Sequence, residues 1–525
     1  FIGYDSNGNK YVTSCDKNLK ASNIYGGNNQ GGQTNIANIN LTRGIVDYLY
    51  GGGKQAQTQD AIINITNTKV NKNIYGGGDE ASINTVDLTV SSSIIGNEND
   101  LGNIFGGGNQ APVDSTIRMN IKDNTTIYGS VYGGGNQGDV LGLIESIIES
   151  SKITENVYGG GNQAPVGQSG NTNIALSLTL SNTQANNVFG GGNAASINGN
   201  TILNINNQSI ITNSVYGGGN LGEIIGKPTT TISDSTITEN VYGAGNKASV
   251  GISETTDATE LNIDNVTAKN IYGGGNAALV DGDTSVLIKN ATISGNTYGG
   301  GNDGAVLGNA ITKITDSTIG ESVHAGGNGK TAVVVTGNEV DVSGKTVITK
   351  HLFGGGNAAA TGCENDFTSS GDAITCTNKN SAKSYVNIAG ATISGNVYGG
   401  ANTSVVYGET YVNIGINTIE DVNDYQKDDI QIGGTVFGGG EANASGSVDY
   451  DFKFISVTKG ININIDASKH TNYIISGSIL GSGNASSSGG YSYVNINNYG
   501  NGDNYKTNVS LQRADIVTIN NSSIE

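Results

Sequence analysis

The chain has no tryptophan, and its 525 residues include only 3 prolines, 1 methionine and 3 cysteines. Ala, Leu, Glu and Lys never form a run with apolar residues at helical spacing, so α-helices are not expected. Roughly 18 consecutive apolar residues would be needed for a membrane-spanning helix, and no such run occurs. The scarce residue types and missing patterns therefore exclude an ordinary helical domain and a helical membrane span.

Charge is also scarce, because charged residues make up only 14% of the chain. The 45 acidic residues outnumber the 26 basic ones, which gives a net charge of −19. A nucleic-acid-binding protein needs a basic stripe to neutralise phosphates, and none is visible. The acidic excess is typical of a soluble, secreted surface.

Glycine, by contrast, is abundant, with 82 copies, and short β-branched runs alternate with polar residues, as at 201–206 and 461–466. Glycine-rich chains are often disordered. Here 35% of residues are hydrophobic and stand at fixed places relative to the glycines. The alternation predicts an ordered, all-β chain.

One heptad, Asn-Val-Tyr-Gly-Gly-Gly-Asn, recurs with small variations along the whole chain. We number each copy by its aromatic position, called the marker. The sixteen markers are Tyr25, Tyr50, Tyr75, Phe105, Tyr132, Tyr158, Phe189, Tyr216, Tyr242, Tyr272, Tyr298, His324, Phe353, Tyr398, Phe437 and Leu480. Most intervals are 25 to 31 residues, a period typical of solenoids. The sequence therefore predicts a single-stranded parallel β-helix of about sixteen coils with three short strands per coil.

Equivalent residues of stacked parallel coils lie about 4.8 Å apart, so like side chains can pair along the stack. The residue four places after the marker is predicted to form an asparagine ladder. Its members include Asn109, Asn136, Asn162, Asn193, Asn220, Asn246, Asn276 and Asn302. The markers are predicted to form an aromatic stack, which includes Tyr132, Tyr158, Phe189, Tyr216, Tyr242 and Tyr272. The glycines fit a corner with positive φ or one where two coils approach too closely for a Cβ.

The repeats suggest four regions: a lead-in at 1–22, a regular solenoid at 23–353, a solenoid with lateral insertions at 354–480, and last coils at 481–525. A second period of 82 to 84 residues indicates that three coils form the duplicated unit. The insertions lie at 361–383, 420–429 and 447–459, and we expect them to form one contact surface. The repeat stops in mid-coil at the last residue, so we expect a segment of a longer protein or a chain whose ends pack on something else.

Candidate chemistry is sparse. Cys363 and Cys376 suit a disulfide bond that staples one insertion, with free thiols as the alternative. His324 occupies a marker position and is expected to fill the aromatic stack. No metal site and no cofactor are predicted, although oxygen-rich turns such as 281–283 leave calcium as an alternative. A glycosidase needs two carboxylates roughly 5 to 10 Å apart. No such pair stands out, so an enzyme is not expected.

These coils and ladders resemble the parallel β-helix of pectin-lyase-like and autotransporter-passenger proteins, and especially the Gly- and Asn-rich repeats of large surface adhesins of gut bacteria. The resemblance covers residues 23–525 and implies an extracellular, non-enzymatic structural or adhesive rod, secreted or on the bacterial surface. Its expected partner is a glycan, a protein or further copies of itself, with no nucleic acid and no membrane span. A self-assembling filament and a polysaccharide lyase or hydrolase remain as alternatives.

Overall fold

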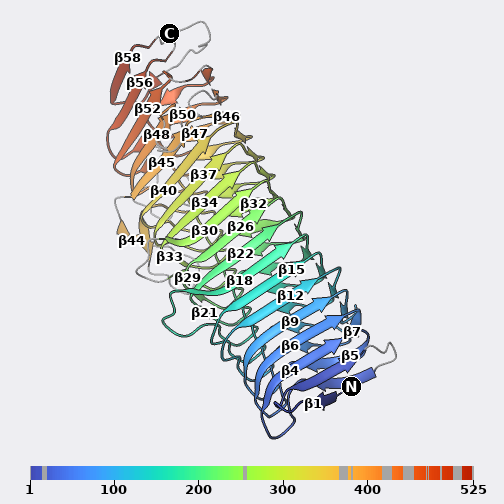
Figure 1. Cartoon of the computed structure of the whole chain (residues 1–525). Coiled ribbons are helices and arrows are strands. Elements are labelled where there is room, and N and C mark those ends of the chain that lie inside the picture. The colour runs from blue at the N-terminus through green and yellow to red at the C-terminus, as the bar shows by residue number, and fades with distance from the viewer. Residues whose placement is uncertain are drawn as a thin grey trace. The chain divides into compact units, whose positions relative to one another are not determined.

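The computed structural model describes residues 2–14, 20–251, 257–365, 376–379, 382–416, 429–441, 455–468, 470, 472–484, 487–499 and 511–522. This part of the chain is an all-β parallel solenoid of about 16 turns without helices. It divides into two units, unit 1 (Phe1–Glu239 with Ala244–Ile252) and unit 2 (Asn240–Gly243 with Ser253–Glu525). Each unit is a stack of similar coils (Figure 1).

Every regular coil begins with a long strand that pairs in parallel with the long strands of neighbouring coils (Figure 1). In unit 1 these are β2 (Lys10–Ser14), β4 (Thr34–Leu41), β6 (Thr58–Thr66), β9 (Ile83–Ser91), β12 (Ile117–Lys122), β15 (Ile144–Glu149), β18 (Ile174–Ser181), β22 (Asn200–Asn206) and β26 (Pro228–Ser233). In unit 2 they are β30 (Asp257–Asp264), β34 (Asp283–Lys289), β37 (Asn309–Thr315), β40 (Gly337–Ser343), β45 (Ala382–Ile388), β48 (Gly408–Ile414), β52 (Gly460–Asp466), β56 (Ser492–Asn497) and β58 (Ile516–Asn520).

A short second strand follows the long strand after a tight turn. In unit 1 these are β7 (Thr68–Val70), β10 (Ile94–Ile95), β13 (Thr126–Ile127), β16 (Lys152–Ile153), β19 (Gln184–Ala185), β23 (Ile210–Ile211) and β27 (Thr236–Ile237). In unit 2 they are β31 (Thr267–Ala268), β35 (Thr292–Ile293), β38 (Thr318–Ile319), β41 (Val347–Ile348), β46 (Ala391–Ile393), β49 (Ile430–Ile432) and β53 (Tyr473–Ile475).

The third strand ends on the marker, or on Gln512 in the last coil that has one. In unit 1 these are β3 (Lys20–Tyr25), β5 (Gly44–Tyr50), β8 (Ile74–Tyr75), β11 (Ile104–Phe105), β14 (Val131–Tyr132), β17 (Val157–Tyr158), β20 (Val188–Phe189) and β24 (Val215–Tyr216). In unit 2 they are β28 (Asn240–Tyr242), β32 (Asn270–Tyr272), β36 (Thr297–Tyr298), β39 (Val323–His324), β42 (Leu352–Phe353), β47 (Val397–Tyr398), β50 (Val436–Phe437), β54 (Ile479–Leu480) and β57 (Leu511–Gln512).

A few strands stand outside this scheme. They are β1 (Ile2–Tyr4), which pairs antiparallel with β2, the short β21 (Ile197–Asn198), β25 (Ile224–Ile225), β29 (Val250–Gly251) and β33 (Val280–Asp281), the antiparallel pair β43 (Cys363–Asn365) and β44 (Cys376–Lys379), and the parallel pair β51 (Ile455–Val457) and β55 (Ser487–Ser488). The β43–β44 pair belongs to the insertion that contains Cys363.

The core fills the inside of the coil. Alternate residues of each long strand point inward, and the parallel register places equivalent residues of successive coils on one another. Ile39, Ile63 and Leu88, for example, are in register on β4, β6 and β9, and each is fully buried. Burying each such side chain contributes about 1.5–3 kcal/mol. The repeated apolar alternation thus gives one continuous core within each unit.

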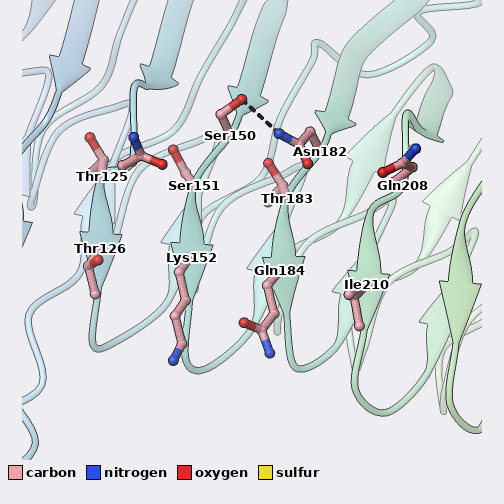
Figure 2. A pocket seen from close by; sticks show the side chains of 11 residues that line it. Thr125, Thr126, Ser150, Ser151, Lys152, Asn182, Thr183, Gln184, Gln208 and Ile210 are labelled. Atoms are coloured by element: carbon pink, nitrogen blue, oxygen red, sulfur yellow. Dashed lines mark hydrogen bonds between the residues drawn. The ribbon is translucent and has the colours of Figure 1, made fainter.

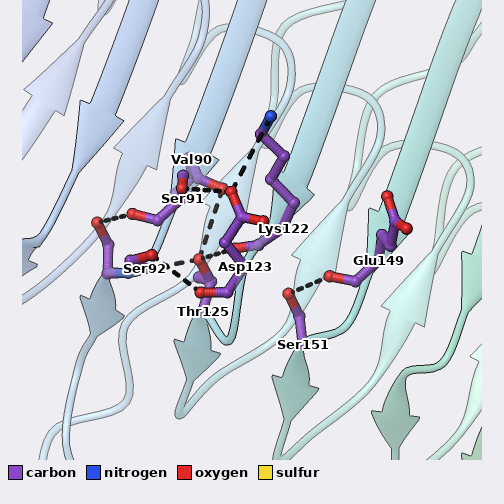
Figure 3. A network of polar contacts seen from close by, with 9 residues as sticks. Val90, Ser91, Ser92, Lys122, Asp123, Thr125, Glu149 and Ser151 are labelled. Carbon is purple, nitrogen blue, oxygen red and sulfur yellow. Dashed lines mark hydrogen bonds and ion pairs between the residues drawn. The ribbon is translucent and has the colours of Figure 1, made fainter.

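Most turns that follow a long strand share one design. Their first residue has a positive φ, as at Asp123 and Ser150. A Ser or Thr then donates its hydroxyl to a carbonyl just before the turn, as Ser151 does to Glu149 O over 2.8 Å and Thr125 to Lys122 O over 2.7 Å (Figure 3). The side-chain bond replaces a backbone partner that the turn removes, which is the usual role of these residues in turns.

The marker glycines turn the corner because two coils approach closely there. A Cβ on Gly51 would lie 2.0 Å from Gly76 O, and one on Gly134 would lie 2.8 Å from Gly161 N. None of the described marker glycines has a positive φ. Close approach, and not left-handed backbone, is therefore the reason for glycine at this corner.

Candidate functional site

The predicted asparagine ladder is a continuous chain of side-chain hydrogen bonds. In unit 1, Asn136 Nδ2 donates to Asn109 Oδ1 over 2.9 Å, and Asn162 Nδ2 donates to Asn136 Oδ1 over 2.8 Å. The same bond joins Asn193, Asn220 and Asn246 in turn, each at 2.8 or 2.9 Å. In unit 2, Asn302 donates to Asn276 over 2.9 Å, and the ladder continues through Asn328, Asn357 and Asn402. Each amide both donates and accepts, so the ladder fixes the corner.

The markers stack beside this ladder. In unit 1, ring centroids from Tyr25 to Tyr216, through Tyr132, Tyr158 and Phe189, lie 4.7 to 5.0 Å apart with planes within 11°. In unit 2, the rings from Tyr242 and Tyr272 to Phe437 lie 4.6 to 5.0 Å apart. Burial raises the pKa of the stacked tyrosines, that of Tyr272 to about 12. Both ladders tie successive coils of a unit together.

A second polar ladder, not foreseen from the sequence, lies two residues before the markers. Asn187 Nδ2 donates to Asn156 Oδ1 over 2.9 Å in unit 1, and Asn270 repeats this bond to Asn240 in unit 2. His351 occupies this position in one coil, and its Nδ1 accepts from Asn396 N over 2.9 Å. The repeated Asn or Ser before the Val-aromatic pair was the signal for this ladder.

Cys363 is buried and disulfide-bonded. Cys376 stands on β44, opposite Asn365 of β43, and its side chain lies outside the described residues. Much of the expected contact surface also lies outside them, namely 366–375, 380–381, 420–428 and 447–454. The side chains that the structure does describe carry the polar groups considered below.

The strongest concentration of such chemistry lies on the outward face of unit 2. Glu339 and Asp341 alternate with buried valines on β40, so both carboxyl groups point away from the core. Asn387 of β45 donates to Asp341 Oδ1 over 2.7 Å and to Glu339 Oε1 over 3.2 Å. Lys313 of β37 is in register with Asp341 on the other side. Side chains from three coils thus surround one carboxyl pair, which we call the acid pair.

The acid pair is largely shielded from solvent, although it lies on the outward face of β40. Asp341 is only 3% exposed, and Asn387 is 4% exposed. Burial and then the nearby Asp341 charge raise the pKa of Glu339, while burial also raises the pKa of Asp341. Burial thus favours the neutral form of both carboxyl groups, and the amide of Asn387 donates to each of them.

An aromatic platform adjoins the acid pair. Tyr385 is in register with Glu339, and its ring stacks on Tyr411 of the next coil with centroids 4.8 Å apart. Both rings are half-buried. Tyr411 donates its hydroxyl to Glu409 Oε2 over 2.7 Å, and this bond is the main cause that raises the Tyr411 pKa to about 12. A row of amides, Asn387 and Asn413, runs beside the platform, with Asn413 donating to Asn387 over 2.8 Å.

Neither the acid pair nor the platform was singled out from the sequence. The signal for the pair was present in Gly337–Ser343, where Glu and Asp alternate with Val, so a strand places them on one face. The signal for the platform was weaker, because two tyrosines 26 residues apart gain meaning only when their coils are in register. At the acidic turn 281–283, which the sequence offered as a calcium site, Asp283 Oδ1 accepts a hydrogen bond from Asn309 N over 2.6 Å.

Comparison with known proteins gives no further guide: no family model, curated protein or solved structure matches the chain. Among the described residues, no group of three or more His, Cys, Asp or Glu side chains could hold a metal ion. The described part of the chain also contains no helix with the length and apolarity that a bilayer crossing needs. The outward-facing side chains of the coils therefore carry the information about function.

Proposed function

We propose that the chain is an extracellular, non-enzymatic β-solenoid segment of a bacterial surface protein, and that it adheres to a glycan. The Tyr385–Tyr411 platform beside the amides of Asn387 and Asn413 carries this proposal. Aromatic faces with neighbouring amides suit sugars, because one ring face is apolar while its edges carry hydroxyls. The disulfide at Cys363 supports an oxidising, extracellular location.

The repeating fold supports a structural role. Each coil adds about 4.8 Å to a stack that the asparagine ladder, the aromatic stack and the apolar core hold together. Outward side chains are then free to differ from coil to coil without cost to the core. A surface protein gains from such a design because contact residues can be presented on a stiff support.

Binding of the purified chain to immobilised plant, bacterial and host polysaccharides tests the proposal. Replacing Tyr385 and Tyr411 together with alanine should lower affinity at least about tenfold, because a sugar ring would bury apolar area against both rings at about 25 cal/mol per Å². Tyr128→Ala in unit 1 is the matched control, because Tyr128 is also half-buried and belongs to neither the platform nor the stack. Equal binding by the double variant and the wild type would refute the assignment. Surface labelling of producing cells tests the location.

The acid pair favours one second function, a polysaccharide hydrolase or lyase. Glu339, whose pKa burial raises, would donate a proton to the leaving group of a bound polysaccharide. Reducing-end and unsaturated-product assays with the same polysaccharides distinguish the two functions. Turnover by the wild type that Glu339→Gln abolishes, with unchanged polysaccharide binding, would favour the enzyme. Binding without turnover would favour the adhesive role.

A further inference from the structure

Unit 1 contains a separate polar cavity of about 340 Å³ on the outer side of four successive coils (Figure 2). Its lining comes from the turn after each long strand and from the start of β13, β16, β19 and β23. Thr126, Lys152, Gln184 and Ile210 occupy the same register position on these strands, and Figure 2 shows them in one row. The cavity is therefore a groove that crosses the stacked coils.

Differences in turn length explain why the groove exists. The turns at its two ends each have two residues with positive φ, Asp123 with Asn124 and Asn207 with Gln208. The two turns between them have one each, Ser150 and Asn182. The longer turns thus form two walls, three coil rises or about 14 Å apart, and the shorter turns form the floor.

Two residues that line the groove have a left-handed backbone conformation although neither is Gly, Asn or Asp, the residues that usually adopt it. Ser150 has φ 46° and Gln208 has φ 63°, whereas most such turns in unit 1 use Asn or Asp. Asn and Asp tolerate this conformation best among non-glycine residues. Strain of this kind is retained where a side chain is needed for another purpose, and functional sites are the common case.

The groove contains polar groups that the fold leaves unused. Its inner hydroxyls are satisfied, since Thr183 donates to Ser181 O over 2.9 Å and Ser151 to Glu149 O. Within the described residues, by contrast, the side chains of Lys152, Gln184 and Gln208 form no hydrogen bond or ion pair. All three are exposed, and no carboxylate lines the groove. One ammonium and two amides are thus available to a ligand on a chain that is otherwise acidic.

We propose that this groove binds a carboxylated saccharide. Lys152 pairs with the carboxylate, the amides of Gln184 and Gln208 bond ring hydroxyls, and Ile210 packs against the apolar face of a sugar ring. Lys152 is the one cation among the described residues that line the groove, which suits a sugar with one carboxylate better than a densely charged polymer. The ligand class rests on the proposed glycan-binding function, but the site is distinct from the platform of unit 2.

Calorimetric titration of the full chain tests the proposal with two probes of equal size, a tetrasaccharide that carries glucuronic acid and a neutral glucose tetrasaccharide. Lys152→Ala should weaken binding of the acidic probe at least tenfold and leave binding of the neutral probe within about twofold. The matched control is Lys69→Ala, because Lys69 is an exposed lysine in the same row of strands outside the groove. Equal loss in both lysine variants, or no binding of the acidic probe by the wild type, would overturn the proposal.

The wall is tested separately by deleting Gln208, which makes that turn as short as the one at Asn182. The deletion should preserve the circular-dichroism spectrum and remove most binding of the acidic probe. Gln208→Gly keeps the turn length and positive φ but removes the amide, so it should bind with intermediate affinity even if the deletion fails to fold. Wild-type affinity in Gln208→Gly would contradict the assigned role of the amide.

The platform variants separate this site from the proposed function of unit 2. In a chain with Tyr385 and Tyr411 replaced with alanine, the acidic tetrasaccharide should still bind, and Lys152→Ala should still weaken that binding at least tenfold. Loss of that binding in the platform variant would refute the groove in unit 1 as the site. Loss of polysaccharide adhesion alone would support both assignments.

Discussion

The imidazole ring of His324 stacks on the ring of Phe353, with centroids 4.6 Å apart and planes within 3°. Its other face stacks on Tyr298 at 5.0 Å. His324 is buried, and its Nδ1 has no hydrogen-bond partner among the described residues. Burial and then the nearby His351 lower the pKa of His324 to about 3. A histidine in the aromatic stack is therefore neutral, unlike one exposed to water.

This stacking predicts a pH-dependent stability. Between about pH 6.5 and pH 3, the unfolded chain binds a proton at His324 that the folded chain does not bind. The free energy of unfolding should therefore fall as the pH is lowered through this window, by up to roughly 1.4 kcal/mol per pH unit. Above about pH 7 the effect of this histidine should be absent.

The variant His324→Phe isolates the effect, because phenylalanine occupies the marker position in other coils. Urea unfolding at pH 8 and pH 5 should show a smaller loss of stability at pH 5 for this variant than for the wild type. His351→Asn serves as the control at the neighbouring polar ladder, where Asn is the common residue. Identical pH dependence in His324→Phe and the wild type would refute a neutral buried imidazole.

The asparagine ladder predicts that replacing one of its amides with a carboxylate lowers stability, because each amide must donate as well as accept. Asn162 donates to Asn136 and accepts from Asn193, both over 2.8 Å. Aspartate can accept but cannot donate, so Asn162→Asp should lower the free energy of unfolding by about 1–3 kcal/mol. Asp79→Asn at the start of the ladder should be nearly neutral, because Asp79 accepts from Asn109 over 2.8 Å and from Tyr25 over 3.5 Å, and the asparagine oxygen can accept as well. Thermal unfolding at pH 7 compares the two.

The close approach of coils predicts that the marker glycines cannot be replaced. A Cβ on Gly134 would lie 2.8 Å from Gly161 N and 3.0 Å from Gly161 Cα, both backbone atoms. Gly134→Ala should therefore cost at least the roughly 1–3 kcal/mol typical of overpacking. Gly31→Ala is the control, since a Cβ there meets nothing within 4 Å. Similar melting temperatures for both variants would contradict the packing explanation.

The acid pair predicts the opposite pH trend from His324. Burial and the Asp341 charge raise the pKa of Glu339, so the folded chain keeps a proton that the unfolded chain has already lost. Stability should fall as the pH rises from below the unfolded pKa, about 4.3, through the raised folded pKa. Glu339→Gln should reduce this fall because glutamine stays neutral. Chemical unfolding from pH 4 to pH 8 measures the difference, with exposed Glu145→Gln in unit 1 as the control.

The periodic features of this protein were predictable from the sequence. The marker interval gave the coil, and the alternation of apolar residues gave its core. Stacked side chains such as Asn136 and Tyr132 follow directly, because residues one period apart must meet when parallel coils stack. These interactions depend only on the repeat, so the repeat was sufficient to predict them.

Features that depend on unequal coils were decided only by the tertiary structure. The groove beside Lys152 exists because two turns are one residue longer than the two between them. The acid pair of Glu339 and Asp341 lies beside Asn387 although an insertion separates β40 from β45 in sequence. The marker positions require glycine because two coils approach closely there, and not because the backbone has a positive φ. Only the three-dimensional structure distinguishes these two reasons. The sequence by itself determined the repeating coil. Which exposed side chains come together was decided by the register between coils of different length. That register depends on packing in three dimensions, so only the tertiary structure shows it.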